Sequence, residues 1–481
     1  MNSDTSLLRE IHRDGVDAGE RAALAEGRLA PVILWIRAAH SPLVRLQLSG
    51  RVTRSRPPRE QPGEVFATFD ASGRLSSLET VPDASLTDEG NRPDQTSEDA
   101  WPLIAAATGL DPDAFQPTTP RWAPPHYVDR VLAWQQTCET ADTKVSRVEA
   151  GFRGATVATI RTLRGFEDVT TESASSSGQS AVSQTVNVLL ILSVLAGGAI
   201  LARRNTHLGR VDSRGALRVA TFIFGLDLVV WLLRADHAIG AGNEFELFVL
   251  ACGGALFNGA FVWLLYMALE PEVRRHWPQR LISWERLVTR NGRDPLVGRH
   301  LLAGLMIGLG LTVMLSFVGW LLWAHFEPHS ETLASGISLM TGARHAIGAV
   351  LKHLSNAVFA GFFITVLVLL GRLVMRRTWA AVLLTSLIFV GLNALQSDPW
   401  YVSAAISAVL LVAVMVSLLR FGLLSLAVTI FVLNLFQSAP LVLSWHGWQG
   451  TVAALPSLFV LALSLVAFRL ALGNQSLIAM D

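Results

Sequence analysis

The feature that most constrains this chain is a series of apolar segments, each close to the length of a membrane span, that begins after residue 185. An α-helix needs about 20 apolar residues to cross the hydrocarbon core of a bilayer. Segments that reach or approach this length lie at 186–202, 219–234, 246–269, 301–323, 346–371, 379–395, 402–419, 422–436 and 451–468. The low share of charged residues, 16%, agrees with them, because soluble proteins carry about 25%. The sequence predicts a multi-pass α-helical membrane bundle of about nine spans over residues 186–472.

The connection at 269–300 orients these spans because it is rich in arginine. It contains Arg274, Arg275, Arg280, Arg286, Arg290, Arg293 and Arg299. Short loops with an excess of Lys and Arg stay in the cytoplasm. When this loop is placed inside, the inside connections hold 17 arginines, and the outside ones hold little more than Arg234 and Arg344. We expect the C-terminal tail, 473–481, to be cytoplasmic and the N-terminal region to lie outside.

The polar N-terminal region shows a different periodicity, typical of strands. Alternating residues on both sides of the turn 70–73 predict a hairpin of strands 64–69 and 75–81. A second hairpin is expected at 144–152 and 155–163, with its turn at Arg153 and Gly154. A further strand is expected at 43–48, and the apolar spacing of 98–108 indicates a helix that ends near Gly109.

These elements indicate a small extracytoplasmic α+β domain ahead of the bundle. We place it at 42–167, after a linker or weak helix at 1–41 and before a Ser/Thr-rich linker at 168–185. The longest apolar run before the linker, 31–36, is too short for a span or a signal-peptide core. A domain of this size does not readily cross a membrane without such a segment. The sequence therefore suggests that a further crossing precedes it in a longer protein.

Several motifs resemble the membrane half of large bacterial serine/threonine protein kinases. The most specific are YMALEPEVRRHWPQRLISWERLV at 266–288 and RDPLVGRHLLAG at 293–304. Looser similarity covers ILARRN at 200–205, VDSRGALRVATFIF at 211–224, FATFDASGRLSSLETVPD at 66–83 and VEAGFRGATV at 148–157. The resemblance implies a bacterial inner-membrane protein in which an extracytoplasmic domain and a multi-span module accompany a cytoplasmic kinase domain.

The kinase domain itself is absent from this sequence. His12-Arg13-Asp14 matches part of a catalytic loop, but Gly19 stands where the required Asn should be, and no phosphate-binding or metal-binding kinase motif accompanies it. The first hypothesis is therefore a non-catalytic sensor or anchor module. Its expected partners are the lipid bilayer, a cytoplasmic kinase domain or other partner, and an unknown extracytoplasmic ligand. We predict no cofactor, metal or nucleic-acid partner.

The arginine-rich loop also has amphipathic character. Trp284 and its apolar neighbours gather on one helical face, while Arg286 and Arg290 gather on the other, and Trp277 lies just ahead. Such a helix is suited to lie in the headgroup layer, with its arginines at anionic lipid, or to contact a cytoplasmic partner. A solvated linker whose arginines serve only topology is the alternative.

Asp227 lies in the middle of the second apolar run, where an ionised carboxylate is costly. Its expected partners on other helices are Lys352, Asn258, Asn356, Asn393 and Asn434. One reading is a packing contact between helices. The alternative function is a multi-span transporter or permease for a small molecule that uses Asp227. Histidines at the ends of runs, such as His325 and His329, have zinc-like spacing, but Pro328 argues against a regular helix there.

Overall fold

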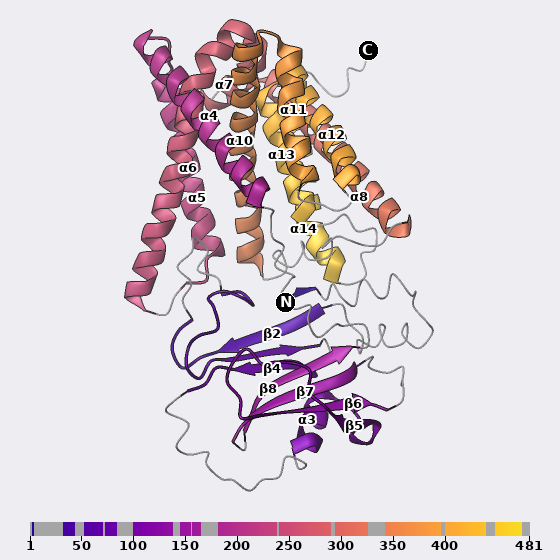
Figure 1. Cartoon of the computed structure of the whole chain (residues 1–481). Coiled ribbons are helices and arrows are strands. Elements are labelled where there is room, and N and C mark those ends of the chain that lie inside the picture. The colour runs from indigo at the N-terminus through magenta and orange to yellow at the C-terminus, as the bar shows by residue number, and fades with distance from the viewer. Residues whose placement is uncertain are drawn as a thin grey trace. The chain divides into compact units, whose positions relative to one another are not determined.

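We describe the protein from a computed structural model, which covers residues 2–3, 32–43, 52–70, 73–83, 100–137, 145–154, 156–164, 181–237, 240–289, 294–325, 342–395, 400–438 and 448–473. The chain divides into two compact units (Figure 1). One contains residues 1–177 and two short later segments, and the other contains the rest of the chain from residue 178. The first unit is built on a β-sheet and the second is a helical bundle.

The sheet unit has eight antiparallel strands in the order β1-β2-β3-β4-β8-β7-β6-β5. Along the chain they are β1 (Asn2–Ser3), β2 (Val32–Ala38), β3 (Val65–Phe69), β4 (Leu75–Thr80), β5 (Phe115–Thr118), β6 (Arg130–Gln136), β7 (Val145–Arg153) and β8 (Thr156–Arg164). The last strand, β8, pairs with both β4 and β7. The strand β8, which is the last of this unit before the helices begin, therefore lies in the middle of the sheet.

Both predicted hairpins are confirmed. At the β3–β4 turn, the Asp70 carboxylate accepts a hydrogen bond from the backbone N–H of Arg74 at 2.9 Å, and Gly73 adopts a φ of 83°. At the β7–β8 turn, Gly154 has a φ of 56°. Left-handed backbone of this kind favours glycine because it has no Cβ. The two glycines thus allow the tight turns that the alternating strands require.

The predicted helix is also present, as α3 (Trp101–Thr108), and Gly109 ends it in the left-handed conformation. Trp101 stacks on Trp134 of β6, with ring centroids 4.7 Å apart, and lies 5.5 Å from the ring of Phe115 in β5. These rings belong to a buried core with Ile104 and Phe152. Burial of such aromatic side chains is a large share of the stabilisation of a small domain.

The domain begins earlier than predicted, and four strands were missed: β1, β2, β5 and β6. β2 pairs with β3, so the sheet extends N-terminally beyond the expected start at residue 42. β5 and β6 were not predicted either, because their pairing depends on contacts across a connection of irregular backbone rather than on a tight turn. Most of the expected strand 43–48 and most of the predicted linkers, 1–41 and 168–185, lie outside the described residues.

The helical unit consists mainly of long apolar helices. They are α4 (Ala181–His207), α5 (Ser213–Arg234), α6 (Ala241–His276), α7 (Ile282–Val288), α8 (Pro295–His325), α10 (Ala343–Met375), α11 (Thr378–Ala394), α12 (Trp400–Val416), α13 (Leu423–Ser438) and α14 (Trp448–Leu472). A 3₁₀ turn, η5 (Pro278–Arg280), precedes α7, and a π turn, η6 (Ser417–Phe421), joins α12 to α13. Each predicted apolar run coincides with one of the longer helices.

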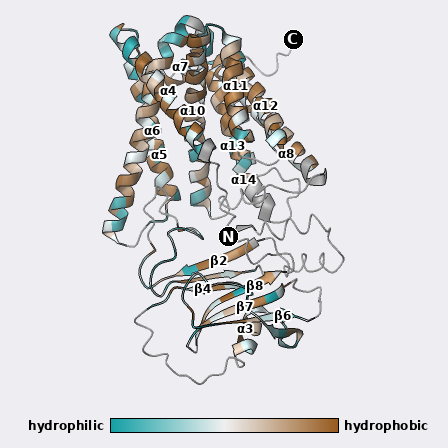
Figure 2. Ribbon diagram, in the orientation of Figure 1, coloured by the Kyte–Doolittle hydropathy of each residue, from teal (hydrophilic) through white to brown (hydrophobic). Residues whose placement is uncertain are grey.

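Among the described residues, seven helices are long and apolar enough to cross a membrane. The helices α11 and α13 are apolar but shorter, with 17 and 16 residues. The multi-pass helical architecture is therefore shown, whereas the number of nine crossings is not. Large apolar side chains on the outside, such as Met306 at 71% exposure and Val374 at 79%, agree with a bilayer around the bundle (Figure 2).

The helix α13 lies in the interior of the bundle, since nearly all of its residues are buried. It packs against glycines of α8: a Cβ at Gly304 would lie 2.6 Å from the carbonyl oxygen of Ser425, and one at Gly308 would lie 2.7 Å from the Cβ of Val432. The small-residue motif at 304–308 thus serves helix packing. The two helices can approach each other closely because glycine has no side chain at these two positions.

Candidate functional site

Asp227, the predicted intramembrane acid on α5, lies at a junction of three helices. Its carboxylate accepts a hydrogen bond from Asn258 Nδ2 of α6 at 2.7 Å and one from Ser355 Oγ of α10 at 2.8 Å. Lys352 Nζ, also on α10, lies 3.8 Å from Oδ1. Asp227 is 9% exposed, so protein covers most of it. Both carboxylate oxygens therefore have donors from neighbouring helices.

The structure brings together two of the partners predicted for Asp227, Asn258 and Lys352, and excludes others. Asn356 is exposed, and the side-chain amide of Asn393 donates to the carbonyl of Phe389 in its own helix. Sequence reasoning missed Ser355. Ser355 lies three residues after Lys352, so the two residues share one face of a helix. This spacing could have predicted Ser355 as a partner of Asp227.

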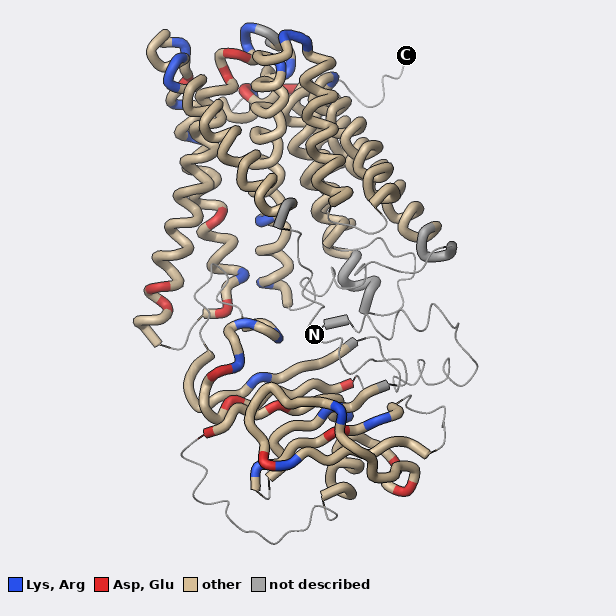
Figure 3. Tube along the Cα trace, in the orientation of Figure 1, with Lys and Arg blue, Asp and Glu red and all other residues tan. Residues whose placement is uncertain are grey.

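A second concentration of polar residues lies at one end of the helical unit, where most of its arginines gather (Figure 3). We call this region the arginine end. Contacts between helix termini define it: Asn205 of α4 donates to Met267 O of α6 at 3.3 Å, and the backbone N–H of Asp212 donates to Glu270. Exposed arginines here are Arg203, Arg204, Arg210, Arg214, Arg218, Arg274, Arg275, Arg299, Arg376, Arg377, Arg420 and Arg469. Arg290 and Arg293 lie outside the described residues.

Part of the arginine-rich loop is fixed by ion pairs. Arg274 lies 2.9 Å from Glu270 and 2.9 Å from Glu285 of α7. Arg286 pairs with Asp294, whose carboxylate also accepts a hydrogen bond from the backbone N–H of Leu296, 2.8 Å away, in the first turn of α8. That N–H and Arg286 hold the pKa of Asp294 below its usual range. The acidic residues of the loop therefore act as caps and tethers.

Protein covers both tryptophans of the loop. Trp277 is 8% exposed and Trp284 is 6% exposed. Trp284 packs edge-on against Phe362 of α10, with ring centroids 5.2 Å apart. The apolar face of α7 therefore covers the core of the bundle, and the placement of the loop helix in the headgroup layer, with its arginines at anionic lipid, stays a prediction. Arg274, Arg275 and Arg299 of the loop are exposed.

Two arginine side chains lie over the ring of Trp277. The guanidinium carbon of Arg280 lies 4.7 Å from its ring centroid, and that of Arg372, from the last turn of α10, lies 4.9 Å away. Burial, together with the neighbouring charge of Arg372, lowers the pKa of Arg280. Among the described residues, no carboxylate pairs with either arginine. Arg372 was not predicted as a site residue, since it is distant in sequence from the loop.

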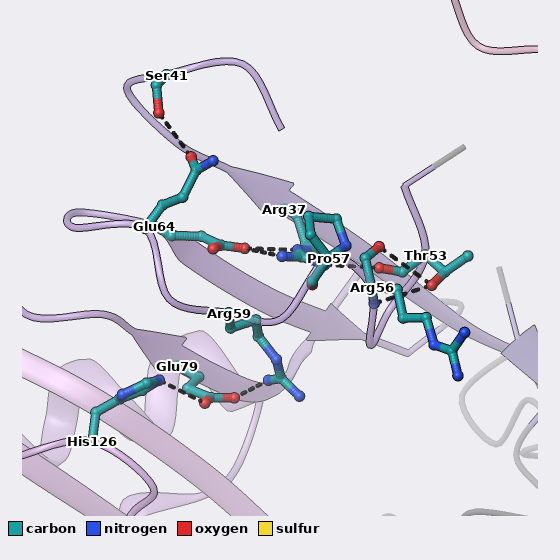
Figure 4. Close-up of polar contacts among 10 residues, drawn as sticks. Arg37, Ser41, Thr53, Arg56, Pro57, Arg59, Glu64, Glu79 and His126 are labelled. Carbon is teal, nitrogen blue, oxygen red and sulfur yellow. Dashed lines mark hydrogen bonds and ion pairs between the residues drawn. The ribbon is translucent and has the colours of Figure 1, made fainter. Parts of the chain in front are cut away.

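The sheet unit holds a polar cluster that sequence reasoning did not predict (Figure 4). Glu79 of β4 pairs with Arg59, and one of its oxygens lies 3.3 Å from His126 Nε2. Burial and the charges of Arg59 and Arg153 lower the pKa of His126 from its usual 6.5. These residues come from separate segments, so only the folded sheet brings them together.

Nearby in the sheet unit, a buried ion pair explains how β2 joins the sheet. Arg37 of β2 lies 2.5 Å from Glu64, and both side chains are fully buried. Arg37 also donates to the carbonyls of Thr53 and Pro57, at 3.0 and 2.8 Å (Figure 4). A charged residue inside an apolar run is thus compensated by a partner 27 positions away.

Metal binding has no support within the described part of the chain, which contains no group of three or more His, Cys, Asp or Glu that could hold an ion. His353 of α10 instead shares a hydrogen bond of 2.8 Å with Ser438 of α13. His329 and His446 lie outside the described residues, and so does the side chain of His325.

Comparisons with known proteins add no assignment. No protein-family model matches this chain, and neither does any curated protein or solved structure. The similarity to the membrane half of receptor-like kinases therefore stays a prediction from the motifs.

Proposed function

We propose that this chain is a non-catalytic membrane sensor or anchor module that acts on a cytoplasmic kinase domain or partner through its arginine end. The observation that carries the proposal is the concentration of exposed arginines where eight described helices begin or end: α4, α5, α6, α8, α10, α11, α12 and α14. Positive charge of this kind belongs to the cytoplasmic side of a membrane. The arginine end then faces the cytoplasm of a bacterial cell.

The same orientation assigns a side to the sheet unit. The helix α4 ends at the arginine end, where Asn205 donates to α6, so its first residue lies at the opposite end of that helix. The chain before Ala181 is then extracytoplasmic, which suits a domain that binds an external ligand. Nine crossings keep the arginine-rich connections inside, with α11 and α13 as the shorter crossings.

The transport alternative has weaker support from the surroundings of Asp227. Both of its oxygens accept hydrogen bonds from fixed donors, which is how polar residues join helices in membranes. Transport through Asp227 predicts that Asp227→Asn abolishes an ion or small-molecule flux into vesicles that the parent protein mediates. Equal flux in both proteins would dismiss this role.

The orientation is tested by reporter fusions after Gly292, in the arginine-rich loop, and after Gln179, before α4. We expect the Gly292 fusion to be active only as a cytoplasmic reporter and the Gln179 fusion only as an extracytoplasmic one. Activity of both fusions on the same side would overturn the proposed topology.

The partner is tested by placing a photo-crosslinking amino acid at Arg275 of the full chain in cells. The control position is Ile347, an exposed residue near the start of α10, at the other end of that helix from its terminal arginines. We expect Arg275, and not Ile347, to crosslink a protein that contains a kinase domain. Crosslinks to lipid alone at both positions would contradict the proposed function.

A further inference from the structure

The two arginines on Trp277 have an unusual electrostatic environment. Both guanidinium carbons lie within cation–π range of one indole ring, 4.7 and 4.9 Å from its centroid. The Nη1 atom of each is buried and has no hydrogen-bond partner. Like charges that share one ring repel each other, and buried charges are ordinarily paired. The site therefore has a deficit of negative charge.

The remaining donors of these arginines are also unused by the protein. The side chains of Arg280 and Arg372 make no hydrogen bond or ion pair with a described residue, and their Nε and Nη2 atoms are not among the buried, unpartnered atoms. Those donors are thus open to the surroundings. By contrast, Arg274 and Arg286 in the same loop are paired with carboxylates.

The backbone that presents Arg280 is fixed before any ligand binds. Trp277 N–H donates to Val273 O at 2.7 Å, and Arg280 N–H donates to Trp277 O at 3.0 Å. The carbonyl of Arg280 packs directly on Gly422, where a Cβ would overlap it and where φ is 94°. Arg372 lies in the last turn of α10, and the backbone N–H of Arg376 donates to its carbonyl at 2.7 Å. Both side chains therefore project from fixed backbone, which reduces the entropy lost on binding.

We propose that Arg280 and Arg372 together bind a phosphate group, such as that of an anionic phospholipid headgroup, at the arginine end. A guanidinium binds phosphate through parallel charge-assisted hydrogen bonds, and two of them supply enough donors for one phosphate. Basic sites among membrane helices at the cytoplasmic surface bind anionic headgroups in this way. The site does not depend on the proposed kinase partner, because all of its residues belong to this chain.

The test uses purified full-length protein and two sources of phosphate. Thermal unfolding and native mass spectrometry are measured in nanodiscs of phosphatidylcholine, with and without phosphatidylglycerol, and separately in detergent with added inorganic phosphate. The variant is Arg280→Gln with Arg372→Gln, which retains the length of the side chains and removes the charge. The matched control is Arg203→Gln with Arg204→Gln, two exposed arginines at the same end.

We expect the site variant to lose about tenfold or more of its affinity for phosphatidylglycerol, as removal of charged hydrogen bonds predicts. The affinity of the control variant for phosphatidylglycerol should stay within about twofold of that of the parent, because screened surface charges contribute little. If inorganic phosphate stabilises the parent but not the site variant, the site also accepts soluble phosphate. The proposal would be overturned if the site variant and the control variant lost the same affinity for phosphatidylglycerol. It would also be overturned if the site variant bound both phosphatidylglycerol and inorganic phosphate as tightly as the parent.

A further variant separates binding from folding. Arg280→Lys keeps the charge but loses the parallel pair of donors, so it should bind phosphatidylglycerol more weakly than the parent and more tightly than the double variant. Its unfolding midpoint in phosphatidylcholine alone should equal that of the parent. If Arg280→Lys binds as tightly as the parent, only non-specific charge acts at this position and the proposed site is wrong.

Discussion

Replacing Asp227 by asparagine should destabilise the helical unit by about 1–2 kcal/mol, mainly because one of two fixed donors loses its acceptor. The carboxylate accepts from Asn258 at 2.7 Å and from Ser355 at 2.8 Å. Asparagine keeps one acceptor oxygen and turns an NH₂ group toward the other donor. Hydrogen bonds between membrane helices average about 0.6 kcal/mol and reach about 1.7 kcal/mol. One lost bond and one mismatched donor give the stated range.

The ion pair with Lys352 should add less than these hydrogen bonds. At 3.8 Å the gross attraction is roughly 4 kcal/mol with an effective dielectric constant of about 20. The Lys352 side chain is 33% exposed, however, so water or headgroups screen it. Desolvation of Asp227 offsets much of the remainder. We therefore expect a coupling free energy between Asp227 and Lys352 below about 1 kcal/mol.

A double-mutant cycle measures this difference directly. Asp227→Asn and Lys352→Met are made singly and together, and their unfolding free energies in detergent micelles are compared with those of a second cycle, Asp227→Asn with Ser355→Ala. The coupling to Ser355 should exceed the coupling to Lys352. A coupling to Lys352 above about 2 kcal/mol would refute this reasoning and make the charge pair the main interaction.

Two further predictions concern packing and pH. Gly304→Ala should destabilise the bundle by about 1–3 kcal/mol, since its Cβ would lie 2.6 Å from the carbonyl oxygen of Ser425. Gly310→Ala, with no atom within 4 Å of the new Cβ, should be neutral or stabilising by up to about 1 kcal/mol. Thermal unfolding of both variants checks this, and equal effects would contradict it. In the sheet unit, the lowered pKa of His126 means that the unfolded state binds a proton first, so stability should fall as the pH drops below about 6.5. His126→Gln should flatten this dependence in unfolding measured across that range, and an unchanged pH dependence would show that His126 is not the responsible group.

Local pattern was enough to predict much of the architecture. Alternation around Gly73 and Gly154 predicted the two hairpins, because a sharp turn between alternating strands leaves little choice of pairing. Long apolar runs predicted the helices in the same way, since a bilayer requires every backbone polar group to bond within its own helix. The cost of a charge in such a run also pointed to Asp227 and to its contacts with Asn258 and Lys352.

The tertiary structure decided which apolar faces meet lipid and which meet protein. Trp277 and Trp284 have the same sequence pattern in either case, because lipid chains and a protein core are both apolar. Only the packing of α7 on α10, through Phe362, shows that protein covers Trp284. For a similar reason, the sequence does not determine the number of crossings. The helix α13 is mostly apolar, yet it lies inside the bundle.

Sequence alone therefore determined the helices of the bundle, the two hairpins, their approximate bounds and the end of the bundle that carries the arginines. Tertiary structure alone determined the meeting of distant residues: Arg37 with Glu64, His126 with Glu79, and Arg280 with Arg372 on Trp277. The physical reason is range. Turns, helical periods and the cost of charge in a bilayer act over a few neighbouring residues, whereas these contacts join segments that only the packed fold brings within a few ångströms.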